Sequence, residues 1–217
     1  MDLFNKITIS NLIWYIVPGL GMIFFVLFPI LALNPHIVKL FYEQIGEIGL
    51  LILGTILGFL FEGLRLYRFR PGYSTIKKGF FDELTKTIGT DLNPYFVQSH
   101  VDDFARTKNY VGLSLHHAIW IMLGQFTILF LFEALFWGIM AIYNYYYITQ
   151  YYSLFGLNIS RIEYITYCGA FSVTFLSIGL RLMVTSTQDQ KNTNNMFLNF
   201  AKQYRHDLQK LLNMEVD

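Results

Sequence analysis

Four long runs of apolar residues constrain this 217-residue chain more than any other feature. A bilayer core about 30 Å thick needs roughly 20 apolar residues in an α-helix that rises about 1.5 Å per residue. Four segments reach that length: 11–33, 45–67, 117–143 and 164–184. None of them shows the alternation of a barrel strand. The sequence therefore predicts an all-α, polytopic membrane protein with four transmembrane helices and the lipid bilayer as its surroundings.

A soluble helical bundle is the alternative to this prediction. Helices of a soluble bundle keep a polar face, whereas 22–33, 50–60 and 128–135 are apolar nearly all round. Only 14% of the residues are charged, against about a quarter in soluble domains. The composition therefore favours the membrane.

Lysine and arginine are distributed unevenly between the predicted loops. Fourteen of the sixteen lie in the N-terminal tail, the segment between the second and third spans, and the C-terminal region. The other two, Lys39 and Arg161, lie in the loops near 34–44 and 144–163. Cytoplasmic loops of membrane proteins carry the excess of positive charge. We therefore predict a multi-pass protein of the cell membrane with both termini in the cytoplasm.

This topology divides the chain into four parts. A first pair of transmembrane helices covers 1–67, a cytoplasmic helical loop 68–116, a second pair 117–184, and a C-terminal linker with an amphipathic helix 185–217. The polar run 185–195 is the linker, and apolar residues spaced by three and four predict a helix over 196–212.

The cytoplasmic loop is long enough for two short amphipathic helices. Ser74 is a candidate cap for the first, and Gly89 is placed to end it. Asn93 followed by Pro94 marks the start of the second. The apolar stripes over 74–105 and 196–212 have to be covered by the inner leaflet of the membrane, by each other, by a second subunit of a homo-oligomer or by a cytoplasmic protein partner. Nothing indicates nucleic acid.

An internal repeat links the two halves of the chain. Residues 59–66 read FLFEGLRL and residues 175–182 read FLSIGLRL, so six of eight positions agree at an offset of 116. A parallel two-fold repeat is the prediction, since each half would hold two spans of the same orientation. The alternative is that membrane segments share Leu, Phe and Gly by composition alone.

Ionisable and polar residues within the spans are the first candidate functional residues, because they are costly in hydrocarbon. They are Glu133 and Gln125 in the third span and Glu62 in the second. Glu133 either binds a cation or a proton in a cavity, or is hydrogen-bonded to a neighbouring helix. Both interpretations remain open at this level.

Basic residues at the inner rim form a second candidate set: Arg65, Arg68, Arg70 and Arg181. They either reach to lipid phosphates or form a ring of arginines at a cytoplasmic mouth. In the second span Gly54 and Gly58 form a GxxxG pattern, which permits the close approach of a second helix, including one at a subunit contact.

Catalytic patterns do not occur in the sequence. It has no HExxH, GxSxG or P-loop, and its one cysteine, Cys168, lies in an apolar run. We therefore predict no enzyme, no catalytic or metal-ligating residues and no cofactor.

In plan, the chain resembles small four-span membrane proteins of bacterial antiviral defence loci. It is similar to the membrane accessory family of type VI-B CRISPR loci and to the membrane subunit of the Kiwa system. The resemblance implies a role in antiviral defence. Three functions are open: an oligomeric pore or channel controlled through its cytoplasmic helices, a non-conducting sensor or adaptor that docks a cytoplasmic effector on basic residues, and a small cation- or proton-coupled transporter that uses Glu133.

Overall fold

The computed structural model describes residues 16–64, 66–69, 72–108, 110–147 and 152–214. This part of the chain contains seven α-helices, one 3-10 helix and a single short β-hairpin. The elements are α2 (Val17–Leu33), α3 (Pro35–Leu64), η3 (Leu66–Phe69), α4 (Tyr73–Ile88), α5 (Pro94–Thr107), α6 (Val111–Tyr146), β1 (Ser153–Leu154), β2 (Leu157–Asn158), α7 (Arg161–Gln203) and α8 (Arg205–Met214). The predicted all-α class is confirmed.

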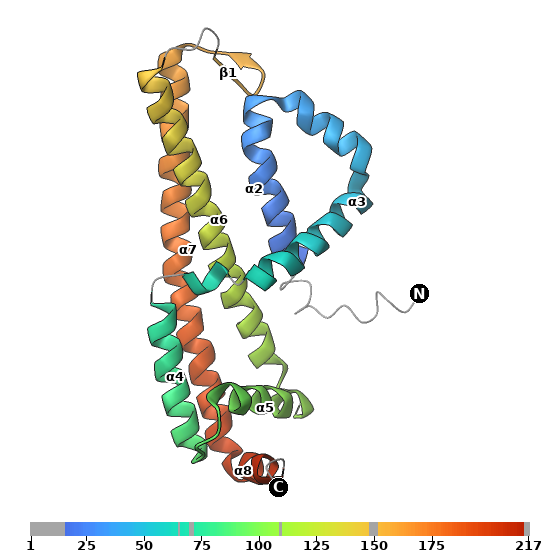
Figure 1. Cartoon of the computed structure of the whole chain (residues 1–217), viewed down its shortest axis with the longest axis vertical. Helices are drawn as coiled ribbons and strands as arrows, with labels where there is room; N and C mark the ends of the chain where they lie inside the picture. The colour runs from blue at the N-terminus through green and yellow to red at the C-terminus, as the bar shows by residue number, and fades with distance from the viewer. Residues whose placement is uncertain (1–15, 65, 70–71, 109, 148–151, 215–217) are drawn as a thin grey trace.

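Two long antiparallel helices, α6 and α7, run side by side along most of the molecule (Figure 1). The hairpin of α2 and α3 lies beside their upper part, below β1. Helices α4, α5 and α8 gather around their lower ends. We call the upper part, which contains α2, α3 and the stretches of α6 and α7 beside them, the apolar half. We call the lower part, which contains α4, α5, α8 and the remaining stretches of α6 and α7, the polar half.

Three described helices are long and apolar enough to cross a bilayer: Pro35–Leu60, Leu115–Tyr146 and Arg161–Gln203. Helix α2 is also apolar but has only 17 residues. Residues 11–15 of the predicted first span lie outside the described part. Length and composition thus support a multi-pass membrane protein, with α2 as a shorter fourth apolar helix.

Helix α3 bends sharply at Gly46, whose φ of 64° and ψ of 179° are not helical. Glycine alone adopts such angles readily, because it lacks a Cβ. The segment 34–44, predicted as a loop, is helical from Pro35 onward, which corrects that prediction. Pro35 favours this outcome, since proline suits the first turn of a helix.

Small side chains hold α6 and α7 close together. The Ser172 hydroxyl donates a hydrogen bond to the carbonyl of Ala134, at 2.7 Å. The Ser186 hydroxyl donates to the carbonyl of Trp120, at 2.8 Å. Such bonds between helices satisfy polar groups that lipid cannot. The two hydrogen bonds fix the position of α6 relative to α7 at two points along their length.

Aromatic rings fill the core of the apolar half. Trp137 is completely buried, and its ring centroid lies 5.0 Å from that of Phe171 on α7 and 6.0 Å from that of Phe28 on α2. Phe25 of α2 meets Phe130 of α6 edge to face at 4.7 Å. Edge-to-face pairs add about 1 kcal/mol each beyond the area they bury. This core joins α2 to the α6–α7 pair.

The polar half has a core of its own. Its completely buried members include Leu84 of α4, Val101 of α5 and Leu208 of α8, with Phe197 of α7 1% exposed. The rings of Phe80 and Phe197 meet at 6.0 Å. The amphipathic stripes predicted over 74–105 and 196–212 therefore cover one another within the chain.

The predicted polar linker at 185–195 is wrong, because α7 continues through it without a break to Gln203. Ser186, Gln190 and Thr193 are buried on the same side of α7 as Phe197. These polar side chains face the other helices of the polar half. The polar residues at 185–195 therefore belong to a packed helix and not to a linker.

The single helix predicted over 196–212 is likewise wrong, because the chain turns near Tyr204 and begins α8 at Arg205. The turn brings Leu208 and Leu212 into the core of the polar half. The Gln209 side-chain amide donates to the carbonyl of Ile88, at 2.6 Å, and so holds α8 on the end of α4.

The sequence predicted three helix boundaries in the cytoplasmic loop, and the structure can be compared with each. Gly89 ends α4 with a φ of 78°, and Asn93 caps α5 by accepting a hydrogen bond from the Tyr95 N–H at 2.9 Å, so both predictions are confirmed. Ser74 does not cap α4, because the helix begins one residue earlier, after Gly72 with a φ of 79°.

Candidate functional site

Glu133 lies in the aromatic core of the apolar half and is 6% exposed. Its carboxylate accepts a hydrogen bond at 2.9 Å from the indole N–H of Trp137, one turn further along α6. The hydrogen-bond partner is thus on the same helix, whereas one of the two sequence-based interpretations placed it on a neighbouring helix. Gln125 is also completely buried within the protomer. Glu62 lies near the end of α3, and its side chain is outside the described part.

The glycine pair of α3 packs against α2 of the same chain. A Cβ on Gly19 would lie 1.7 Å from the carbonyl oxygen of Gly54 and 2.7 Å from the nitrogen of Gly58. Two helices approach this closely only where neither carries a side chain. The GxxxG surface therefore packs α3 against α2 within the chain, where Gly54 and Gly58 are buried.

The basic residues predicted at the inner rim lie on separate elements. Arg68 belongs to η3, which follows α3 at the junction between the two halves (Figure 1). Arg181 lies exposed on α7. Arg65 and Arg70 are outside the described residues.

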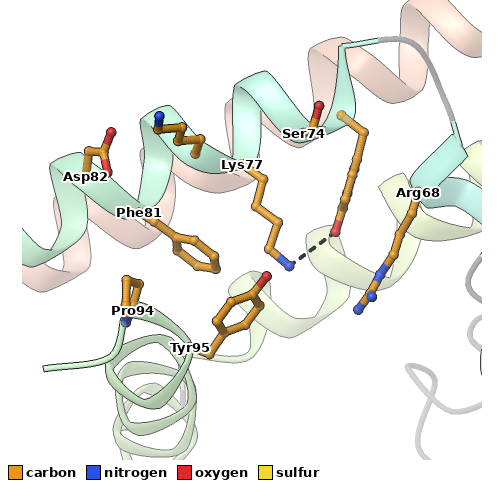
Figure 2. Close-up of a pocket in the computed structure, with 9 residues that line it drawn as sticks. Arg68, Ser74, Lys77, Phe81, Asp82, Pro94 and Tyr95 are labelled. Carbon is orange, nitrogen blue, oxygen red and sulfur yellow. Dashed lines mark hydrogen bonds between the residues drawn. The ribbon is translucent and has the colours of Figure 1, made fainter.

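A cavity of about 370 Å³ lies beside Arg68, between η3, α4 and the start of α5. Figure 2 shows Arg68 and Lys77 pointing into the space between α4 and Tyr95. The residues that line it are Arg68, Tyr73, Ser74, Lys77, Lys78, Phe81, Asp82, Pro94 and Tyr95. We call this cavity the basic pocket. Its size is within the range of about 300–1,000 Å³ typical of small-molecule sites.

One side of α7 carries small and polar residues, with the exposed Val173 and Val184 between them, along its course through the apolar half. All are exposed and recur at spacings of three and four, which places them on one helix face. We call them the polar face of α7: Thr166, Ala170, Thr174, Ser177, Arg181 and Thr185. The opposite side, with Cys168, Phe175 and Gly179, is buried against the rest of the protomer.

The exposed surface of α3 differs in kind from this face. Its outward residues are large and apolar, with Ile48 77%, Ile52 56% and Leu60 59% exposed. Lipid chains suit such residues. On the polar face of α7 the hydroxyls of Thr166, Ser177 and Thr185 donate to carbonyls of their own helix, so the charge of Arg181 is the group least suited to lipid. This face was not among the predicted site residues, although the spacing 166, 170, 174, 177, 181 is visible in the sequence.

No protein-family model, curated protein or solved structure matches the chain. The geometry of the chain itself must therefore carry any functional argument.

Proposed function

We propose that the chain is one subunit of an oligomeric membrane pore, in which the polar face of α7 lines the central axis. The observation that carries this proposal is an exposed row of small, mostly polar residues that includes Arg181, on a helix otherwise suited to lipid. A charged side chain in a span is costly unless it faces water, a partner or the interface. A water-filled axis between subunits would satisfy the whole row.

The packing of the protomer favours a pore between subunits over one within a subunit. The centre of the apolar half is filled by Phe25, Phe130, Phe171 and Trp137. Closely packed aromatic rings leave no aqueous path at this level. The transporter hypothesis fares no better, since it needs Glu133 on such a path and Glu133 is enclosed by the same core.

Control from the polar half is part of the proposal. Helix α7 runs unbroken from Arg161 to Gln203 and so joins the proposed lining to the core around Phe197. The excess of Lys and Arg would place the polar half in the cytoplasm. A cytoplasmic event that moves α4, α5 or α8 would then rotate or tilt the lining helix.

A cysteine-accessibility experiment tests the proposed lining. In a Cys168→Ala background, which removes the only native cysteine, single cysteines replace Thr174 or Ser177 on the polar face. Matched controls are Leu176→Cys and Ile178→Cys, which flank that face and are 43% and 38% exposed. A membrane-impermeant thiol reagent should label the first two in liposomes and spare the controls.

Two further readouts separate the pore from a non-conducting adaptor. Ion flux through liposomes should prefer anions, and Arg181→Glu should shift the preference toward cations, because rings of charge set selectivity. If the polar-face cysteines resist the reagent but form disulfides between subunits, α7 makes a dry contact. That result, with no flux, would replace the pore with the adaptor.

A further inference from the structure

The basic pocket carries more positive than negative charge. Arg68, Lys77 and Lys78 contribute three cations to its lining, whereas Asp82 contributes one carboxylate. Cations converging from different elements are the usual way to hold a phosphate. The charge balance therefore selects an anionic ligand, and it does so independently of whether α7 lines a pore.

Aromatic rings in the pocket surround Lys77. Its ammonium lies 4.5 Å from the ring centroid of Tyr95 and 5.2 Å from that of Phe81. It also donates a hydrogen bond at 3.3 Å to the hydroxyl of Tyr73 (Figure 2). These rings hold a cation through their π faces. They are thus engaged within the protein, and a nucleobase would have to displace Lys77 in order to stack on them.

The place of the pocket in the fold identifies the source of the anion. Arg68 lies on η3, directly after the apolar helix α3, and its neighbour Phe69 is 76% exposed. Where α3 leaves hydrocarbon, the next residues meet lipid headgroups. We propose that the basic pocket binds the headgroup of an anionic glycerophospholipid of the phosphatidylglycerol type.

The four charged side chains of the pocket would contact different parts of the headgroup. Arg68 and Lys78, both exposed, contact the phosphate. The Lys77 ammonium, held among the aromatic rings, adds a third positive charge nearby. Asp82 accepts a hydrogen bond from a headgroup hydroxyl, a group that phosphatidylcholine lacks. The pocket therefore discriminates by both charge and hydroxyl content.

Native mass spectrometry of the delipidated full-length protein tests the proposal. The ligands are dioctanoyl phosphatidylglycerol, dioctanoyl phosphatidylcholine and sn-glycerol 3-phosphate. The variants are Arg68→Gln and Lys78→Gln, and the matched control is Lys86→Gln, which removes one charge from an exposed position of α4 outside the pocket.

Phosphatidylglycerol should bind the wild type at least about tenfold more tightly than phosphatidylcholine. One basic residue near anionic lipid contributes about fivefold, so each pocket variant should lose about that factor and the control should lose none. Equal affinity for both lipids, or equal losses in all three variants, would overturn the proposal. Binding of glycerol 3-phosphate as tight as that of the lipid would also overturn it and assign the pocket to a soluble phosphate ester.

Discussion

The two helix pairs of the apolar half, α2–α3 and α6–α7, differ in how the two helices of each pair contact one another. Helix α3 first runs away from α2, bends at Gly46, and returns to meet α2 where Gly54 and Gly58 lie against Gly19 (Figure 1). Helices α6 and α7 stay together over most of their length. The first pair depends on one close backbone contact, whereas the second distributes its contacts over many residues.

The proposed repeat sharpens this contrast, because its copies lie on α3 and α7. At the offset of 116, Gly63 corresponds to Gly179. A Cβ on Gly63 would meet no atom of the described residues within 4 Å, whereas one on Gly179 would lie 3.2 Å from Leu131. Helix α3 ends at Leu64, but α7 continues to Gln203. Similar local sequence therefore gives two outcomes, and the neighbouring helix decides between them.

The largest expected effect comes from removing the ring that joins the two pairs. Trp137→Ala should destabilise the protein by about 4 kcal/mol, since it empties a completely buried site and removes the partner of Glu133. Denaturation by SDS in mixed micelles measures the change. Phe132→Ala, at a residue 62% exposed, is the control and should change stability little. Equal effects would mean that the core does not join the pairs.

The glycine contact of the first pair gives the next largest effect. In Gly19→Ala the new methyl group would lie 1.7 Å from a backbone oxygen, so α2 and α3 must move apart. The loss should be about 3 kcal/mol in the same assay. Gly63→Ala adds a methyl group in open space and should be neutral or slightly stabilising. A Gly19 variant as stable as the Gly63 variant would contradict the close contact.

The repeat-related glycines provide a direct comparison of the two copies. Gly179→Leu should cost about 2 kcal/mol, because it overpacks the contact with Phe130 and Leu131. Gly63→Leu should cost nothing. Thermal denaturation in detergent of the two variants measures the difference. Equal tolerance at both positions would show that the copies share one environment.

The smallest effect concerns the hydrogen bond where α6 and α7 enter the polar half. Ser186→Ala removes the bond to the Trp120 carbonyl and should cost about 1 kcal/mol. The neighbouring Thr185 is exposed and bonds only to the Arg181 carbonyl of its own helix, at 3.1 Å. Thr185→Ala should therefore leave the melting temperature unchanged. A shift for Ser186→Ala no larger than that for Thr185→Ala would contradict the stabilising role of the bond between α6 and α7.

Part of the candidate site was visible in the sequence. The polar and basic residues could be named, because charge within an apolar run stands out in composition. The surroundings of these residues could not be predicted, because Glu133 and Gln125 could have faced lipid, a cavity or another helix. The basic pocket brings together Arg68, Lys77 and Tyr95 from three elements, and no local pattern connects them.

Local sequence patterns were enough to predict the apolar helices, the end of α4 at Gly89 and the cap of α5 at Asn93. These features follow from the hydrophobicity of one segment or from a bond between residues two apart. Local patterns did not predict that α7 continues through the polar run 185–195, that the chain turns near Tyr204 before α8, or which face of α7 stays exposed. Those outcomes depend on burial against distant helices, and such burial outweighs the weak local preferences of short polar segments.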